Sequence, residues 1–309
     1  MSATKRGSDT MAKPVIGFVG LGLMGHGMAK NIVEAGYPLV VMAHRKREAV
    51  EDLIGRGATE AASPRDLAWA ADIIHLCVTG SPEVESVIRG PEGLAAGAKP
   101  GTIIVDCSTS DPVSTLALAA ELGAQDIALT DAPLSRTPKE AWEGTLDTMV
   151  GADPEVFEKI KPVLDCWAGV IVHLGPVGLG HKMKLINNFI GMGYGALYSE
   201  ALAIARKSGL SPEQVDSVIR PGRLSNGFYE TFMKWTLERD ENAHRFAISN
   251  AHKDMRYLAN LCVAEGCYNP VQSAVRNAYA AMEASGDGDK FVPMLADFVA
   301  ALNGLEPPK

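Results

Sequence analysis

The stretch GFVGLGLMGHGMAKNIVEAGYPLVVMAHRKREAV, residues 17–50, decides the fold class of this chain. It continues an apolar run, Val15–Gly20, that is typical of a buried strand, and it passes directly into a helical pattern. Gly20, Gly22 and Gly25 stand between strand and helix with the spacing GxGxxG. In this context the spacing predicts a turn that holds the pyrophosphate of a dinucleotide, and a glycine-rich turn without a ligand is the alternative.

Each glycine of the turn has a separate predicted task. Gly20 permits the tight turn, Gly22 lets the backbone approach a pyrophosphate, and Gly25 lets the helix pack closely on the strand. The N-terminus of the helix then offers N–H groups and the positive end of its dipole to the phosphates. The predicted cofactor contacts on this turn are Gly20, Leu21, Gly22, Leu23, Met24 and Gly25.

The choice between NAD and NADP depends on a segment about 20 residues further on, where an acidic residue would bind a ribose 2′-hydroxyl. This chain reads His44-Arg45-Lys46 there and carries no acid. Arg45 and Lys46 can pair with a 2′-phosphate, so these three residues predict a preference for NADP(H) over NAD(H). In the alternative, Arg45 stacks on the adenine and Lys46 is solvated.

Short apolar runs alternate with helical patterns through the first half of the chain, which predicts βαβ units and a mostly parallel sheet. From Lys182 onward the periodicity is helical, and residues 182–209 can form one long helix. We therefore predict an α/β protein with an N-terminal Rossmann domain, a long interdomain helix and a C-terminal all-helical domain. The predicted segments are a disordered tail (1–12), an NAD(P)-binding Rossmann domain (13–175) and a helical domain for substrate binding and oligomerisation (176–309).

The composition limits the class of protein. The 309 residues are 47% hydrophobic and 21% charged, which is typical of a globular enzyme rather than a disordered or fibrous chain. The net charge of -8 disfavours nucleic acid or an anionic membrane as a partner. Five scattered cysteines without a CxxC pair indicate free thiols in a reducing compartment, and the histidines lack ligand spacing, so we expect a cytoplasmic protein with no metal. Residues 1–10 lack a secretory h-region.

A second group of candidate residues lies on the predicted long helix. Lys184 and Asn188 are four residues apart and share one helix face, with Asn187 beside them. A lysine on the helix that leads out of the nucleotide domain would lie at the interdomain cleft, where the nicotinamide is expected. A solvated helix lysine is the alternative.

The chain resembles the β-hydroxyacid dehydrogenase family, which includes 3-hydroxyisobutyrate dehydrogenase and tartronate semialdehyde reductase. The matching motifs are GFVGLGLMGHGMAKN, DCSTSDP, DAPLS with EGTLDTMVG, GLGHKMKLINN and HKDMRYLAN, in this order between residues 17 and 260. The resemblance implies an NAD(P)-dependent oxidoreductase for a small 3-hydroxy acid or its aldehyde, with substrates of the 3-hydroxyisobutyrate, 2-hydroxy-3-oxopropionate or sulfolactaldehyde type.

The resemblance also implies roles for single residues. Lys184 matches the catalytic lysine that acts as general acid and base, Asn188 the asparagine that orients the substrate, and Ser135 the serine near the reacting carbon. Asn187 is a further predicted substrate contact. The implied cofactor contacts beyond the glycine turn are Val78, Thr79, Thr109 and Lys253, although a Leu-Pro pair is common at the first two positions.

The sequence departs from the family after DAPLS, because many members read Ser-Gly-Gly where this chain reads Ser135-Arg136-Thr137. Arg136 and Thr137 are predicted to bind the anionic end of the substrate, a pattern most similar to that of sulfolactaldehyde reductases. In the alternative, Arg136 points to solvent.

Two other functions remain open: an enzyme similar to imine reductases, and a non-catalytic scaffold that keeps a dehydrogenase fold. Lys184 argues against both, because such relatives generally lack the catalytic lysine. The expected partners are a small anionic aldehyde or hydroxy acid and, in a homodimer or homotetramer, further copies of the chain.

Overall fold

The computed structural model describes residues 13–44 and 46–306, so the predicted tail 1–12 and Arg45 lie outside the described residues. The described chain divides into two compact units. Unit 1 contains residues 13–110 and 114–181, and unit 2 contains residues 111–113 and 182–306.

Unit 1 is built on a sheet with the strand order β3-β2-β1-β4-β5-β6-β8-β7, and β9 also pairs with β8. The strands β3 to β6 in this order are parallel neighbours, whereas β8 runs antiparallel to β6 and β7 and parallel to β9. This confirms the predicted mostly parallel sheet. The strand bounds are β1 Ile16–Val19, β2 Leu39–Val41, β3 Thr59–Glu60, β4 Ile73–Leu76, β5 Ile103–Asp106, β6 Ala128–Asp131, β7 Leu134–Ser135, β8 Leu146–Gly151 and β9 Ala168–Gly175.

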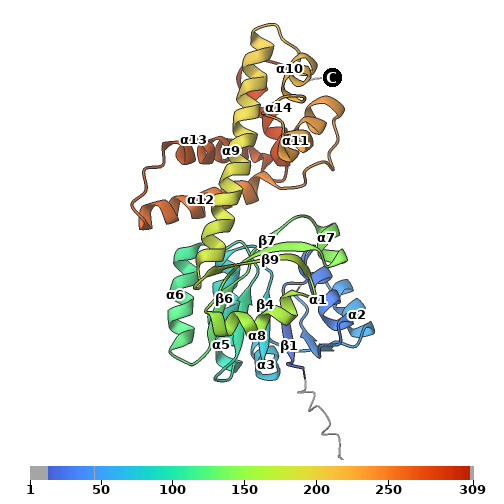
Figure 1. Cartoon of the computed structure of the whole chain (residues 1–309), viewed down its shortest axis with the longest axis vertical. Coiled ribbons are helices and arrows are strands. Elements are labelled where there is room, and N and C mark those ends of the chain that lie inside the picture. Colours follow the sequence, from blue (N-terminus) through green and yellow to red (C-terminus); the bar gives the residue numbers. More distant parts are fainter. Residues whose placement is uncertain (1–12, 45, 307–309) are drawn as a thin grey trace, which may run out of the picture. The chain divides into compact units, whose positions relative to one another are not determined.

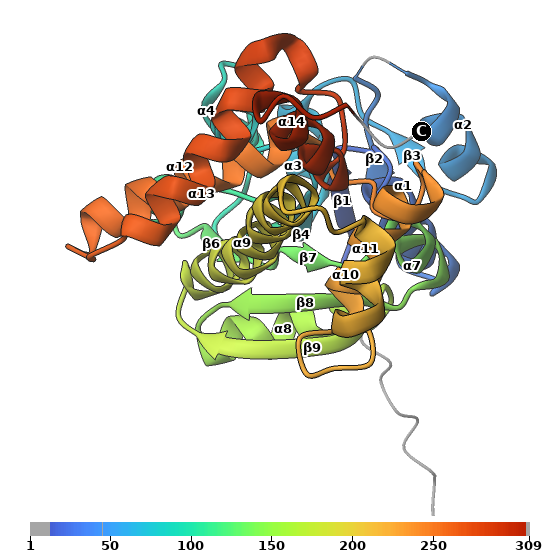
Figure 2. The same ribbon diagram turned by 90° about the horizontal axis from the view of Figure 1, so that it is seen from above.

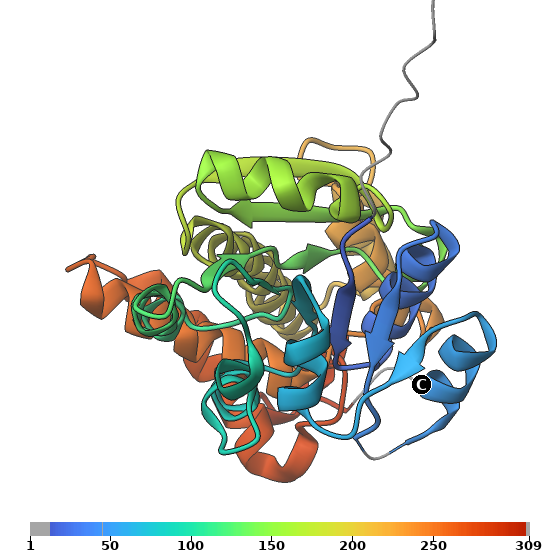
Figure 3. The ribbon, with the colours of Figure 1, turned by 90° about the horizontal axis from the view of Figure 1, so that it is seen from below.

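Helices cover both faces of this sheet, as Figures 1 and 3 show. Apolar side chains of α1, α2, α7 and α8 pack on one face, and those of α3, α4, α5 and α6 pack on the other. Because both faces are covered, the central parallel strands read as continuous apolar runs, and all four residues of β1 are buried. The helix bounds are α1 Gly25–Glu34, α2 Glu48–Gly55, α3 Pro64–Ala70, α4 Ser81–Arg89, α5 Leu94–Gly97, α6 Pro112–Gly123, α7 Pro138–Glu143 and α8 Pro154–Leu164.

The described elements of unit 2 are helices and helical turns, apart from an isolated bridge between Ala247 and Phe291. They are organised around α9, Leu179–Lys207, whose first three residues belong to unit 1. This confirms the predicted single long helix. Helices α12, α13 and α14 pack on α9 around Leu185 and Met192, and α11 packs around Leu202 (Figure 2). The remaining bounds are α10 Pro212–Ile219, α11 Gly227–Glu238, α12 Ile248–Ala264, α13 Pro270–Met282, α14 Leu295–Leu302, a π-helical turn η1 Glu283–Asp287 and a 3₁₀ turn η2 Val292–Met294.

His75 is an unusual residue in the core of unit 1. It is fully buried in β4, its ring stacks on Phe18 with centroids 5.8 Å apart, and it lies nearly perpendicular to the Trp167 ring with centroids 6.1 Å apart. Neither ring nitrogen meets a hydrogen-bond partner in the described part of the chain. This burial lowers the pKa of His75 to about 3, so the ring is neutral in the folded protein.

We expect His75→Leu to stabilise the protein, because it removes two unpaired buried nitrogens that cost about 1–3 kcal/mol. The ordinary pKa of 6.5 is higher than the folded value of about 3, so the unfolded chain binds the proton first. This residue therefore makes the wild type lose stability as the pH falls from about 6.5 towards 3. Urea unfolding at several pH values should show a shallower loss for His75→Leu.

His173→Leu is the matched control, because the ring of His173 is hydrogen-bonded to the Ala152 carbonyl oxygen at 2.7 Å and stacks on Phe157. We expect this variant to lose stability. If His75→Leu is also less stable at every pH, the unpaired nitrogens do not weaken the fold.

Candidate active site

The glycine turn between β1 and α1 has the geometry that the sequence predicts. Gly20 has a φ of +96°, and a Cβ added there would lie 2.2 Å from the Cys77 carbonyl oxygen. A Cβ at Gly25 would lie 2.0 Å from the Gly20 carbonyl oxygen. Both positions therefore require glycine, because any side chain would collide with backbone.

The opposite side of the same turn is open. A Cβ at Gly22 would meet nothing within 4 Å, and the side chain of Leu23 is 78% exposed. Helix α1 begins at Gly25, and the residue before it, Met24, provides no side-chain cap for the first N–H groups. The His26 N–H donates to the Gly22 carbonyl oxygen at 3.1 Å. A helix start without a side-chain cap and with open space beside it fits a pyrophosphate.

The strand order brings three predicted cofactor segments to one edge of the sheet. The turn at Gly20 follows β1, Val78 and Thr79 follow β4, and Thr109 follows β5, and these three strands are neighbours. The last two loops are also joined, because the Val78 N–H donates to Ser108 Oγ at 3.0 Å. In open α/β sheets, ligands bind at such a carboxyl edge where the strand order reverses.

The segment after β2 exposes two of its three predicted cofactor contacts. His44 and Lys46 are exposed, whereas Arg45 lies outside the described residues. The next residue, Arg47, is bonded to Glu60 at 2.9 and 3.1 Å. Within the described ranges Lys46 has no ion-pair partner, so its charge is available to a ligand.

The Ser135–Thr137 segment follows β7, which pairs with β8, and Ser135 lies opposite Asp147. Arg136 is exposed, but its Nε lies 2.8 Å from Asp147 Oδ2, a partner that the sequence analysis did not consider. Its φ of +84° lies in the left-handed region that favours the glycine common in the family. Thr137 caps α7, with its Oγ1 2.5 Å from Glu140 Oε2.

A buried polar cluster of unit 1 holds the first turn of α9. Asp131, at the end of β6, accepts the N–H groups of Gly178 and His181, both at 2.6 Å. The His181 ring is hydrogen-bonded to Thr115 Oγ1 at 2.8 Å and to the Ser108 carbonyl oxygen at 3.1 Å. The sequence analysis passed over Asp131 and treated His181 only as a rejected metal ligand, because its pairing with Thr115 spans 66 residues of sequence.

The predicted catalytic residues of unit 2 lie together with one residue that the sequence analysis missed. Lys184 and Asn188 lie one turn apart on α9, and Asn188 Nδ2 donates to Asp254 Oδ2 of α12 at 2.6 Å. Lys253 Nζ lies 3.0 Å from the other oxygen of Asp254. Asn187, by contrast, is exposed.

The surroundings of Lys184 shift its protonation equilibrium. Burial lowers the pKa of its amine below the ordinary lysine value, and this is the largest influence. The Asp254 carboxylate acts against this change, and the Lys253 ammonium reinforces it. A lysine with a lowered pKa can exchange a proton closer to neutral pH, as a general acid or base must.

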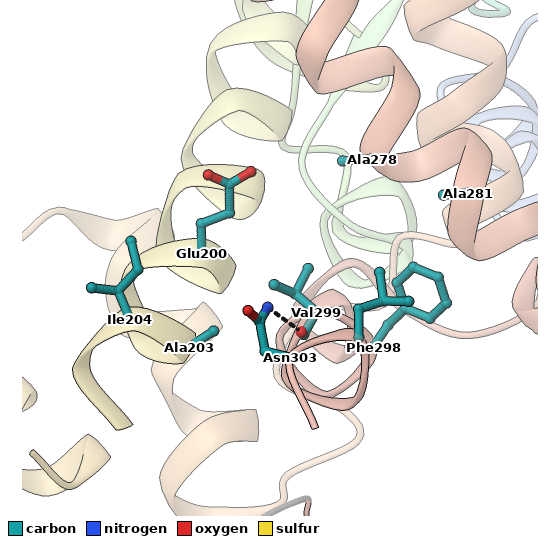
Figure 4. A pocket seen from close by; sticks show the side chains of 9 residues that line it. Glu200, Ala203, Ile204, Ala278, Ala281, Phe298, Val299 and Asn303 are labelled. Carbon is teal, nitrogen blue, oxygen red and sulfur yellow. Dashed lines mark hydrogen bonds between the residues drawn. The ribbon is translucent and has the colours of Figure 1, made fainter. Parts of the chain in front are cut away.

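One cavity of unit 2 is lined by none of these residues. It measures about 380 Å³ and lies between α9, α13 and α14 (Figure 4). Its lining is apolar apart from Glu200 and Asn303, and the Asn303 amide donates to the Val299 carbonyl oxygen at 2.9 Å. Since no predicted catalytic, substrate or cofactor residue lines this cavity, we do not assign the chemistry to it.

The described residues were also compared with the requirements of a membrane-spanning helix and of a metal site. Within residues 13–44 and 46–306, no helix combines the length and apolar character needed to cross a membrane. In the same part of the chain, no three or more His, Cys, Asp or Glu side chains gather closely enough to hold a metal ion.

Comparisons with known proteins agree with this geometry. Residues 15–175 match the family described as the NAD-binding domain of 6-phosphogluconate dehydrogenase. Residues 178–297 match the family described as NAD-binding of NADP-dependent 3-hydroxyisobutyrate dehydrogenase.

Similar single proteins cover most of the chain. The 2-(hydroxymethyl)glutarate dehydrogenase of Eubacterium barkeri is 38% identical over 78% of this chain and 79% of its own length. The 3-sulfolactaldehyde reductase of Escherichia coli strain K12 is 30% identical over 88% of this chain and 91% of its own. The structure of Mycobacterium tuberculosis 3-hydroxyisobutyrate dehydrogenase with L-serine superposes with a TM-score of 0.83 at 25% identity, over 93% of this chain and 99% of that one.

Proposed function

Because the chain belongs to the 3-hydroxyisobutyrate dehydrogenase-like family of NAD(P)-dependent β-hydroxyacid dehydrogenases, we propose that it oxidises a small 3-hydroxy acid or reduces the corresponding aldehyde with Lys184 as general acid and base. That the chain is an NAD(P)-dependent oxidoreductase acting on a CH–OH group follows from the family itself. The observation that carries the finer proposal is the partly buried Lys184, one turn from Asn188 on α9, whose lowered pKa results mainly from desolvation.

The proposed roles follow from the chemistry of each side chain. When bound, the nicotinamide cofactor supplies hydride to the aldehyde carbon or accepts it from the alcohol carbon. During reduction, the Lys184 ammonium donates its proton to the oxygen that becomes the hydroxyl, and during oxidation the neutral amine takes that proton. Asn188 and Ser135 orient the reacting oxygen and carbon.

We assign the anionic end of the substrate to Arg136, with Thr137 and Asn187 as further contacts. Asp147 engages Arg136 Nε at 2.8 Å, and the two terminal nitrogens have no partner in the described part of the chain. Those two nitrogens form a fork that suits a carboxylate, sulfonate or phosphate. The similarity to a 3-sulfolactaldehyde reductase supports an acidic aldehyde of this class.

We propose NADP as the preferred cofactor and NAD as the alternative. The support is the positive charge of Lys46 and of Arg45 and the absence of an acid from residues 42–47. The proposed contacts are the glycine-turn residues Gly20–Gly25, together with His44, Arg45, Lys46, Val78, Thr79, Thr109 and Lys253. Comparing kcat/KM for NADPH and NADH measures this preference directly.

The domain roles and the assembly are also proposals. Residues 13–175 would bind the dinucleotide, and residues 176–309 would provide substrate contacts and contacts between copies in the cytoplasm. Ile190, Leu197 and Ile204 support a homodimer or homotetramer, because these exposed apolar side chains recur every seven residues on α9. Analytical ultracentrifugation gives the number of copies.

A substrate panel tests the function. The purified protein is supplied with 2-hydroxy-3-oxopropionate or sulfolactaldehyde and NADPH, and with 3-hydroxyisobutyrate, 2-(hydroxymethyl)glutarate or L-serine and NADP⁺. We expect turnover with at least one acidic substrate. Turnover with cyclic imines alone would establish imine reduction instead, and failure to bind either cofactor would favour a scaffold.

We expect Arg136→Gly to lower kcat/KM for an acidic aldehyde by at least about tenfold, which corresponds to 1.4 kcal/mol, and to change it little for a neutral aldehyde of equal size. The same variant should melt at a higher temperature, because glycine adopts a φ of +84° without the strain that arginine has there.

Arg136→Ala is the matched variant, because it removes the guanidinium but keeps a Cβ at this φ. It should lose the same activity without the gain in stability. Equal losses for acidic and neutral aldehydes in both variants would mean that Arg136 is structural.

A further inference from the structure

Asp254 is the residue of unit 2 that holds two predicted site residues at once. Its side chain lies on α12 and is 1% exposed. One carboxylate oxygen accepts the Asn188 amide at 2.6 Å, and the other lies 3.0 Å from Lys253 Nζ.

The carboxylate also fixes which way the Asn188 amide is turned. An ionised carboxylate only accepts hydrogen bonds, whereas a side-chain amide accepts at its oxygen and donates at its nitrogen. The Asn188 nitrogen must therefore face Asp254, so its oxygen faces away from α12. With a neutral acceptor and donor in place of Asp254, both orientations of the amide would be possible.

We propose that Asp254 is a positioning residue for the reaction: it turns the Asn188 oxygen towards the substrate hydroxyl and holds the Lys253 ammonium beside α9. This inference rests on the proposed function, because it concerns the substrate contact of Asn188. Asp254 touches neither the substrate nor the hydride, and it acts through its two neighbours.

The same carboxylate acts on the protonation of Lys184. Apart from burial, the influences on the Lys184 amine within the described residues are the charges of Asp254 and Lys253, both on α12 and of opposite effect. Removing the negative charge should therefore shift the protonation of Lys184 to lower pH. Removing the positive charge of Lys253 should shift it to higher pH.

The first test is a mutant cycle on kcat with Asp254→Asn, Asn188→Ala and the double variant. Asp254→Asn keeps the shape of the side chain but allows the Asn188 amide to turn over. We expect kcat to fall about tenfold, since misplacement by about 1 Å has large effects on rate. If Asp254 acts through Asn188, Asp254→Asn should lower kcat little further in the Asn188→Ala background.

The second test does not depend on turnover. The cofactor-free protein is labelled with trace acetic anhydride across a pH series, and acetylation of Lys184 is measured by mass spectrometry. We expect the midpoint for Lys184 to move to lower pH in Asp254→Asn and to higher pH in Lys253→Met. The opposite signs exclude a general loosening of unit 2, which would move both midpoints in one direction.

Asp297→Asn is the control for removing one carboxylate from unit 2. Asp297 is partly buried on α14, where it accepts the Trp235 indole N–H at 3.1 Å and pairs with Arg239. We expect this variant to leave the Lys184 midpoint unchanged.

Two results would overturn the inference: full additivity of Asp254→Asn and Asn188→Ala in kcat, or an unchanged Lys184 midpoint in both Asp254→Asn and Lys253→Met. If Asp254→Asn does not fold, Asp254→Glu takes its place in the mutant cycle with Asn188→Ala, because it keeps the charge but moves the carboxylate relative to Asn188. The proposed function fails on a different result, namely activity that survives the loss of Lys184.

Discussion

Lys184→Ala should lower kcat by roughly 10²–10⁴-fold while leaving the Kd of NADPH within about twofold of the wild type. The loss follows from the removal of the only proton donor that we assign to the reacting oxygen. Affinity is kept because the proposed phosphate contacts lie on the glycine turn of unit 1, on a different unit from Lys184. Steady-state kinetics and fluorescence titration of NADPH measure the two quantities.

Lys182→Ala is the matched control for this variant. Lys182 lies two residues away on the same helix, but it forms an ion pair with Glu265 Oε1 at 2.5 Å. Its loss removes an equal charge and a similar side chain, and we expect less than about a twofold change in kcat, because surface ion pairs contribute at most about 1 kcal/mol. If Lys184→Ala keeps most of its turnover, another group moves the proton and the mechanism proposed here is wrong.

Gly22→Ala should weaken the binding of NADPH and NADH about 100-fold or more without a change in melting temperature. The fold tolerates the methyl group, because a Cβ there meets nothing within 4 Å. That open space is where we place the pyrophosphate, so the methyl group would displace it from the N–H groups of α1. Losing two charge-assisted hydrogen bonds, at about 1.5–3 kcal/mol each, gives an effect of at least this size.

Substitutions of two other glycines are controls that distinguish an effect on cofactor binding from an effect on folding. Gly55→Ala, in α2, also meets nothing within 4 Å; it should leave affinity unchanged and should not lower the melting temperature, because alanine favours a helix over glycine. Gly25→Ala would place its Cβ 2.0 Å from the Gly20 carbonyl oxygen and should destabilise unit 1 before any ligand is added. Normal cofactor affinity in Gly22→Ala would mean that the dinucleotide does not approach the turn at this point.

Features that repeat at short range could be predicted from the sequence. The spacing of Gly20, Gly22 and Gly25 predicts a turn that the structure confirms, since an added Cβ at two of the three would collide with backbone. The long apolar and glycine-rich run of residues 182–209 predicts a single helix, which is found as α9. In both cases the pattern depends on neighbours within one or two turns of the chain.

Strand β9 has a weaker signal in the sequence than the buried strands of the sheet. Val170 and Val172 are both about 45% exposed, and among the described strands β9 pairs with β8 alone. Apolar residues on an exposed face carry no burial signal, so the segment GVIVHLG did not stand out from its surroundings in the sequence.

Contacts between distant residues could not be predicted from the sequence. Asp254 was not predicted as a site residue, although it lies in the recognised motif HKDMRYLAN. Its proposed role depends on a hydrogen bond to Asn188, which lies 66 residues earlier in the sequence. The pairing of Arg136 with Asp147 likewise depends on the antiparallel register of β7 and β8. The glycine-like φ of Arg136 is visible only in the backbone itself.

The anchoring of α9 by Asp131 determines where chimeric enzymes could be joined. Because Asp131 accepts hydrogen bonds from the N–H groups of both Gly178 and His181, the first turn of α9 is fixed to unit 1. A recombinant protein that takes its helical half from a relative should therefore cross over after residue 181. A crossover at residue 176 would combine Asp131 of one parent with the first turn of α9 from the other. The hydrogen bonds from Gly178 and His181 to this carboxylate would then depend on residues that did not evolve together.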